Sequence, residues 1–131
     1  MSNIESLHYY FFGYSTQSRS AQPYMENNKV GSSGYDINKV LESYAKWLYN
    51  NLNSVPKHDL SPLITGEEML AADNNGQYTT GVAGLAYLDA ACWVSSYYKM
   101  ALKTSVTEDR GGFFEGTWSI AHELAHKYTF F

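Results

Sequence analysis

Two histidines four residues apart, His122 and His126, place the strongest constraint on the local fold of this chain. Residues with this spacing lie on one face of an α-helix, about 6 Å apart along its axis. A helix therefore aims both imidazole rings at one point in space. Neutral imidazole nitrogens bind zinc at about 2.0–2.1 Å, so the spacing predicts a helix that supplies two ligands to one zinc ion.

Glu123 follows the first histidine directly, and its carboxylate is expected to point beside the metal and not at it. From there it can reach a water that zinc activates, because zinc lowers the pKa of such a water to about 7 and polarises a carbonyl group. A carboxylate in this place can take a proton and pass it to a leaving amine. The pattern predicts zinc-dependent hydrolysis of a peptide bond, with Glu123 as the general base.

The residues around this motif are uncharged, which predicts a helix that is buried behind the site. They are Ser119, Ile120, Ala121, Leu124 and Ala125. Gly116 and Thr117 allow a turn into the helix, with Thr117 as its N-cap. Two other interpretations stay open: a helix with two surface histidines and no metal, and a protease-like binding module without catalysis.

The composition indicates one small globular domain. The chain has 131 residues, of which 44% are hydrophobic and 16% aromatic, and this is enough to build a core. A net charge of −4 without a basic patch argues against a nucleic-acid partner. No apolar run is long enough for a membrane span, and residues 1–5 lack the pattern of a signal peptide. The oligomeric state cannot be deduced, and Cys92 is read as a buried free thiol or as half of a disulfide.

The clearest expected helix runs from Asp36, as N-cap, to about Asn53. Apolar residues recur along it at spacings of three and four, which is typical of a helix packed against a core. Strands are expected at residues 7–14, 58–65, 82–88 and 99–106. Residues 15–28 and 66–78 are expected to be loops, the latter with one helical turn over residues 67–71. Gly84 lies inside an expected strand and indicates a close backbone approach, here by a substrate chain.

Several short segments keep a familiar order along residues 30–131. They are Asp59-Leu60, Leu63-Ile64-Thr65-Gly66, Gly84-Leu85-Ala86-Tyr87, Cys92, Ser105-Val106-Thr107-Glu108-Asp109 and Ala121-His122-Glu123-Leu124-Ala125-His126. As a set, these segments resemble the adamalysin/reprolysin-like (M12B type) metzincin zinc metalloproteases. The aromatic and Asn-rich upstream region is most similar to the secreted salivary metalloproteases of ticks.

This resemblance implies an α/β fold like the upper subdomain of a metzincin. Its mixed, mostly parallel sheet would carry an antiparallel edge strand and packed helices, with the active-site helix last. Gly84, Leu85 and Ala86 would pair with an extended protein or peptide substrate. Cys92 would pair with a cysteine further along the full-length chain, and the protein would be secreted.

The sequence departs from the metzincin pattern after His126. The pattern places a glycine where Thr129 stands and a third histidine just past Phe131. We therefore expect residues 1–131 to be a single partial catalytic domain, without the lower subdomain, that binds Zn²⁺ weakly and turns over little substrate. Five other side chains could replace the absent third ligand: His8, His58, Cys92, Glu108 and Asp109.

Overall fold

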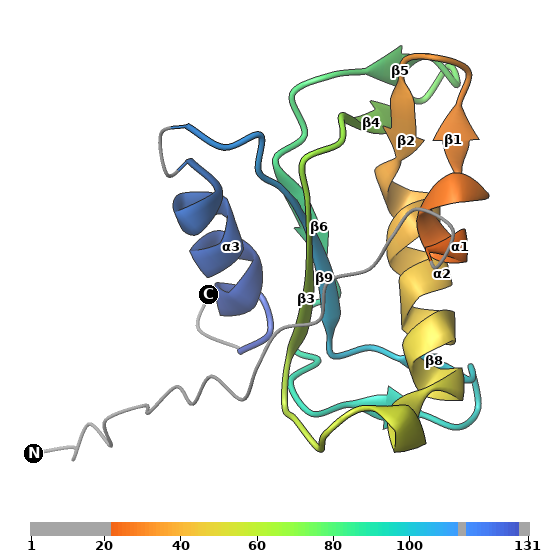
Figure 1. Ribbon diagram of the computed structural model, residues 1–131, viewed down its shortest axis with the longest axis vertical. Helices are drawn as coiled ribbons and strands as arrows, with labels where there is room; N and C mark the ends of the chain where they lie inside the picture. Colours follow the sequence, from red (N-terminus) through yellow and green to blue (C-terminus); the bar gives the residue numbers. More distant parts are fainter. Residues whose placement is uncertain (1–21, 113–114, 129–131) are drawn as a thin grey trace, which may run out of the picture.

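A small mixed sheet lies between two helices in the computed structural model, which describes residues 22–112 and 115–128. The sheet has the strand order β3 (Ser61–Thr65), β9 (Thr104–Glu108) and β6 (Gly84–Ala86). Helix α2 (Ile37–Asn50) covers one face, and α3 (Glu115–Ala125) covers the other (Figure 1). The predicted mixed α/β architecture is confirmed.

The pairing of the strands makes β6 an antiparallel edge strand, as expected. β3 pairs with β9 in parallel, whereas β6 pairs with β9 antiparallel. Elsewhere only β2 and β4 pair in parallel, and the other described pairings are antiparallel. The parallel share is therefore smaller than the resemblance implied, because three of the six described pairings are antiparallel hairpins and β6 also pairs antiparallel. Pro62 lies in β3 at the opposite edge of this sheet, where its missing N–H is tolerated.

Helix α2 forms where the apolar spacing predicts it. The Asp36 carboxylate accepts a hydrogen bond from the Lys39 amide at 3.1 Å and caps the first turn. One face of the helix is buried, through Ile37, Val40, Leu41, Tyr44, Ala45 and Leu48. Each large apolar side chain among them stabilises the fold by roughly 1.5–3 kcal/mol. A 3-10 turn, η2 (Leu52–Ser54), follows the helix before Pro56.

The main hydrophobic core lies between α2 and the sheet. The opposite face of the sheet, which α3 covers, carries small polar side chains. Val106 of β9 is fully buried in the core cluster with α2. Side chains alternate along a strand, so the neighbouring Ser105 and Thr107 face α3. Both are buried, and neither hydroxyl finds a hydrogen-bond partner among the described residues. Helix α3 therefore packs on a small, polar face of the sheet.

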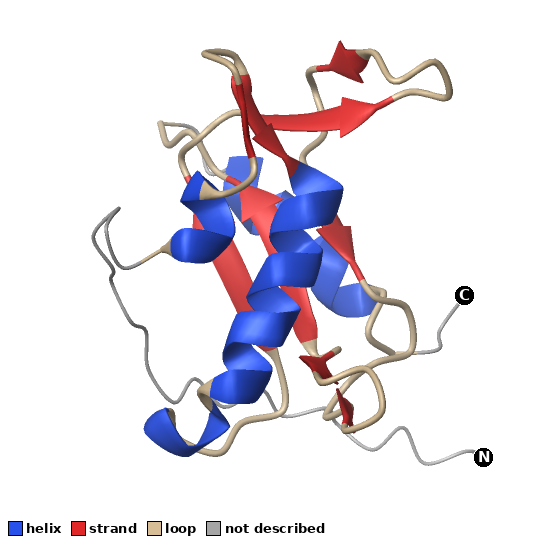
Figure 2. Ribbon diagram, turned by 90° about the vertical axis from the view of Figure 1, so that its right-hand side faces the viewer, coloured by secondary structure: helices blue, strands red, loops and turns tan. Residues whose placement is uncertain are grey.

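A second sheet lies at the N-terminal end of α2. Its strand order is β1 (Lys29–Val30), β2 (Gly34–Asp36), β4 (Met69–Ala72) and β5 (Tyr78–Thr79). A short helix, α1 (Pro23–Glu26), packs on α2, and β7 (Val94–Ser95) pairs with β8 (Met100–Ala101) near the other end (Figure 2).

Three local predictions are wrong. Residues 66–78 are not a loop with a helical turn, because residues 69–79 form the β4–β5 hairpin, in whose turn the Asp73 side chain accepts from two amides. Residues 15–28 include α1, which begins at Pro23. Residues 99–106 are divided between β8 and β9 by a turn. The strand expected at residues 7–14 lies outside the described residues.

Candidate metal and active site

The two motif histidines converge at the end of α3. The His122 and His126 Nε2 atoms lie 2.9 Å apart, and their ring centroids lie 4.5 Å apart. His126 follows the last residue of α3, but its amide still donates to the His122 carbonyl at 3.3 Å. The helical spacing therefore extends to the second histidine. Two nitrogens this close can each reach a single zinc ion at about 2.0–2.1 Å, so this pair fits the metal.

Glu123 lies on the buried side of the helix, beside the histidines and facing the edge strand. Its side chain is only 6% exposed, and an ideal Cβ added to Gly84 would lie 2.7 Å from its Oε1 atom. Burial raises the pKa of Glu123 above its usual value, and the nearby His122, His126 and Lys127 partly offset this rise. Among residues 22–112 and 115–128, no group donates a hydrogen bond to this carboxylate. Its oxygens are therefore free to accept a proton or a hydrogen bond from a bound molecule.

Helix α3 itself is less buried than the uncharged sequence around the motif predicts. Only Gly116 and Glu123 are buried along it, while Trp118 is 79% exposed. In the described part of the chain, the sheet covers one side of this helix and nothing covers the other. The prediction of a buried helix is wrong for this reason. Thr117 is not the N-cap, because the helix begins at Glu115 and Thr117 lies within its first turn.

The edge strand β6 runs beside the buried carboxylate. Gly84, Leu85 and Ala86 pair with Thr107, Val106 and Ser105 of β9 on one side. In the three-stranded sheet of the described residues, no strand pairs with the other side of β6. Its backbone can therefore accept an added strand. The close approach at Gly84 is made by the Glu123 side chain of the same chain, and this explains the glycine without a substrate.

Residues 22–112 and 115–128 contain no third ligand beside the two histidines. No group of three His, Cys, Asp or Glu side chains in these ranges could hold a metal ion. The described candidates for replacement, His58, Cys92, Glu108 and Asp109, therefore do not complete the site. Glu108, for example, accepts a hydrogen bond from the Met69 amide at 2.9 Å and pairs with Arg110. His8 lies outside the described residues.

Lys127 is a buried residue of this region that the sequence did not reveal. It is 2% exposed, and its Nζ atom donates to the Leu102 carbonyl at 2.8 Å and to the Thr104 carbonyl. The same ammonium lies 5.4 Å from the centre of the Tyr87 ring. Burial lowers the pKa of Lys127 to about 8, although Glu123 partly opposes this. A lysine after a helix is ordinarily exposed, so nothing in the sequence signals this burial.

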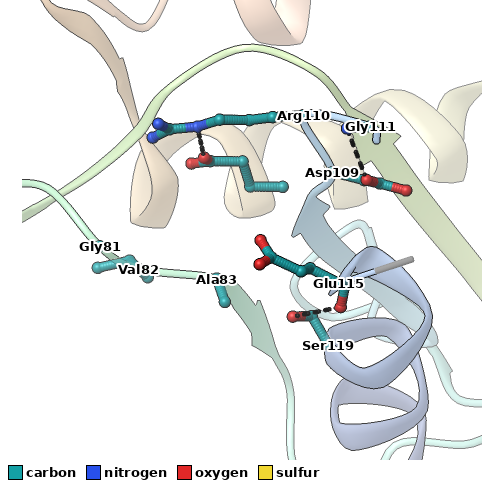
Figure 3. A pocket seen from close by; sticks show the side chains of 9 residues that line it. Gly81, Val82, Ala83, Asp109, Arg110, Gly111, Glu115 and Ser119 are labelled. Carbon is teal, nitrogen blue, oxygen red and sulfur yellow. Dashed lines mark hydrogen bonds and ion pairs between the residues drawn. The ribbon is translucent and has the colours of Figure 1, made fainter. Parts of the chain in front are cut away.

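A pocket lies near the start of α3, away from the histidines. It has a volume of about 200 Å³ and is bordered by residues 81–83 on one side and by Asp109, Glu115 and Ser119 on the other (Figure 3). Arg110 bridges Glu108 and Glu68 at its rim. The pocket adjoins the segment that leads into β6 but contains none of the motif side chains.

Cys92 is exposed and free among the described residues, which corrects the interpretation of it as a buried thiol. Its backbone adopts a positive φ of 60°. Partial burial and a hydrogen bond with Asp59 raise the pKa of its thiol. The predicted disulfide with a cysteine further along the full-length chain stays a prediction.

Sequence comparison identifies the lineage of this arrangement. Residues 11–129, which include β6 and α3, match the family described as Metallo-peptidase family M12B Reprolysin-like. The chain belongs to the M12B reprolysin-like metallopeptidases. It is also 32% identical, over 112 residues, to a Bombyx mori protein named "A disintegrin and metalloproteinase with thrombospondin motifs like". The aligned region covers 85% of this chain and 16% of that relative.

Membership of the reprolysin-like family agrees with the convergence of the two histidines and with the buried glutamate between them. M12B metallopeptidases are zinc-dependent as a family. None of the described helices of this reprolysin-like chain has the length and apolarity required to cross a bilayer.

Proposed function

We propose that this chain provides the zinc-binding helix and the substrate edge strand of a secreted metalloendopeptidase. The observation that carries the proposal is the pairing of two converging imidazoles with a buried, unpaired carboxylate between them. His122 and His126 would hold zinc through their Nε2 atoms. The third protein ligand would come from outside the described residues. The single core of the described residues supports assigning residues 1–131 to one catalytic domain.

Glu123 is proposed as the general base. Bound zinc would supply Lewis-acid activation of a water and of the scissile carbonyl. The free Oε atoms of Glu123 would take the proton of the attacking water and deliver it to the leaving amine nitrogen. Burial raises the pKa of this carboxyl, which makes it a stronger base toward the proton of the water.

β6 is proposed as the substrate strand, so the substrate class is an extended protein or peptide segment. A peptide that adds to the free edge of β6 would hydrogen-bond to the backbone of Gly84, Leu85 and Ala86. Because Glu123 lies against Gly84, the scissile bond of such a peptide would pass beside the carboxylate. Backbone pairing would fix the register of the peptide, and side-chain pockets would set its sequence preference.

A catalytically inactive, protease-like binding module is the alternative. The lack of a third ligand among residues 22–112 and 115–128 favours it for this chain on its own. Such a module would still bind peptides along β6. It would show no dependence of hydrolysis on Glu123.

Hydrolysis of a quenched fluorescent peptide by the zinc-loaded chain separates the two functions. The metalloendopeptidase proposal predicts slow, chelator-sensitive cleavage that Glu123→Gln abolishes while zinc stays bound. Glu42→Gln, at an exposed carboxylate on α2, is the matched control and should cleave at the unaltered rate. Equal cleavage by Glu123→Gln would overturn the assignment of the base, and peptide binding without cleavage would establish the binding module.

A further inference from the structure

The turn that carries His126 is hydrogen-bonded to neighbouring segments at three points. The His126 carbonyl accepts from the Asp89 amide at 2.9 Å, and the Lys127 carbonyl accepts from the Ala91 amide at 3.3 Å. The third point is the Lys127 ammonium, which donates to the carbonyls of Leu102 and Thr104. These contacts join the end of α3 to the segment after β6, to the turn between β8 and β9, and to the first residue of β9.

Lys127 is the only side chain among these tethers, and its environment suits a cation. Its ammonium lies over the face of the Tyr87 ring, which attracts a cation. A positive charge directly after a helix also interacts favourably with the free carbonyls of the last turn. An apolar residue of the same size would leave the buried Thr104 carbonyl and the part-buried Leu102 carbonyl without this donor.

Lys127 and Glu123 are four residues apart and share the buried face, yet no ion pair joins them in the described ranges. The ammonium is satisfied by backbone carbonyls, so it does not occupy the oxygens of Glu123. It therefore places a positive charge near the carboxylate while leaving that carboxylate available.

We propose that Lys127 is a positioning residue, which ties the end of α3 to the β8–β9 turn and thereby holds the His126 imidazole beside that of His122. This inference rests on the proposed zinc site. It assigns no contact between Lys127 and metal or substrate.

The test compares Lys127→Met, Lys127→Arg and the exposed-lysine control Lys46→Met in the full chain, with Co²⁺ as a spectroscopic probe. We expect Lys127→Met to lower Co²⁺ affinity about 10-fold and to alter the visible absorption of the complex, as loss of a group that orients a ligand commonly does. Lys127→Arg should restore most of the affinity, because it keeps the charge and the donors. Unchanged affinity and absorption in Lys127→Met would overturn the proposal.

Amide exchange gives a readout that needs no metal. In Lys127→Met, the Asp89 and Ala91 amides should exchange at least about 10-fold faster relative to the Val106 amide, since the turn is released locally. Equal exchange in the two proteins would also overturn the proposal. If the unaltered chain binds no Co²⁺, the proposed zinc site fails, whereas amide exchange still decides the role of Lys127.

A second variant covers the case in which Lys127→Met does not fold. Tyr87→Leu removes the ring under the ammonium and should reduce Co²⁺ affinity and Asp89 protection in the same direction, by a smaller factor. No change in either quantity would contradict the proposal.

Discussion

Gly84 and Glu123 are in such close contact that the edge strand and the motif helix can meet only at a glycine. A Cβ on Gly84 would lie 2.6 Å from the Glu123 Cγ atom and 2.9 Å from its Cδ atom. Real Cβ atoms do not approach other atoms so closely, so any side chain at position 84 must displace the carboxylate. The glycine therefore keeps the proposed base in place.

Gly84→Ala should destabilise the fold by about 1–3 kcal/mol, the usual cost of overpacking. Most of this loss should vanish in the Glu123→Ala background, because the three atoms nearest to the added Cβ are then absent. Urea denaturation of the single and double variants measures this coupling.

Gly66→Ala is the matched control for that cycle. A Cβ at Gly66 would meet only the Asp109 carbonyl, at an ordinary 3.6 Å, so its effect should be small and independent of Glu123. Additive effects of Gly84→Ala and Glu123→Ala would show that the two residues are not in contact.

Asp36 makes side-chain contacts with both α2 and β5. Asp36→Ala should lower the free energy of unfolding by about 1–2 kcal/mol through the lost helix cap alone. Its Oδ1 atom caps α2, and its Oδ2 atom accepts from the Tyr78 hydroxyl of β5 at 2.8 Å. Tyr78→Phe removes only the second contact and should cost less. Thermal unfolding ranks the variants, and an equal loss in both would show that the cap contributes nothing.

The buried tyrosines make stability fall at high pH. Burial raises the pKa of Tyr24 from the usual 10.0 of a tyrosine to about 12. The folded state therefore holds the phenol proton more tightly than the unfolded chain does. The stability that the folded state gains from a protonated Tyr24 is complete below pH 10, and it is lost as the pH rises through about 12.

Tyr24→Phe should reduce the drop in urea midpoint between pH 9 and pH 11, since it removes this ionisation. Tyr97→Phe, at a side chain that is 86% exposed, is the control and should leave the drop unaltered. The same pH dependence in Tyr24→Phe and the unaltered chain would contradict the assignment to Tyr24.

Helix α2 and the convergence of His122 and His126 were predictable because each depends on local spacing. The cap at Asp36 and the apolar recurrence define α2 without reference to the rest of the chain. The helical rise brings the two imidazoles together in the same way. The edge position of β6 followed from resemblance and is confirmed.

The features that sequence reasoning missed depend on contacts distant in the chain. Lys127 can be buried because its ammonium donates hydrogen bonds to the carbonyls of Leu102 and Thr104, which lie more than twenty positions earlier in the chain. The exposure of α3 depends on what covers it, which no local pattern encodes. The β4–β5 hairpin was the exception, since Asn75-Gly76 is a strong local signal for a hairpin turn and was read as a loop.

The central claim is that His122 and His126 bind one metal ion together, and Zn²⁺ titration by calorimetry tests it most directly. Three single alanine variants are compared with the unaltered chain: His122, His126 and the control His58, whose Nδ1 atom lies 2.6 Å from the Pro56 carbonyl oxygen. We expect one zinc to bind per chain, and this binding to be lost in both motif variants and retained in His58→Ala. Zinc binding that persists unaltered in either His122→Ala or His126→Ala would contradict it.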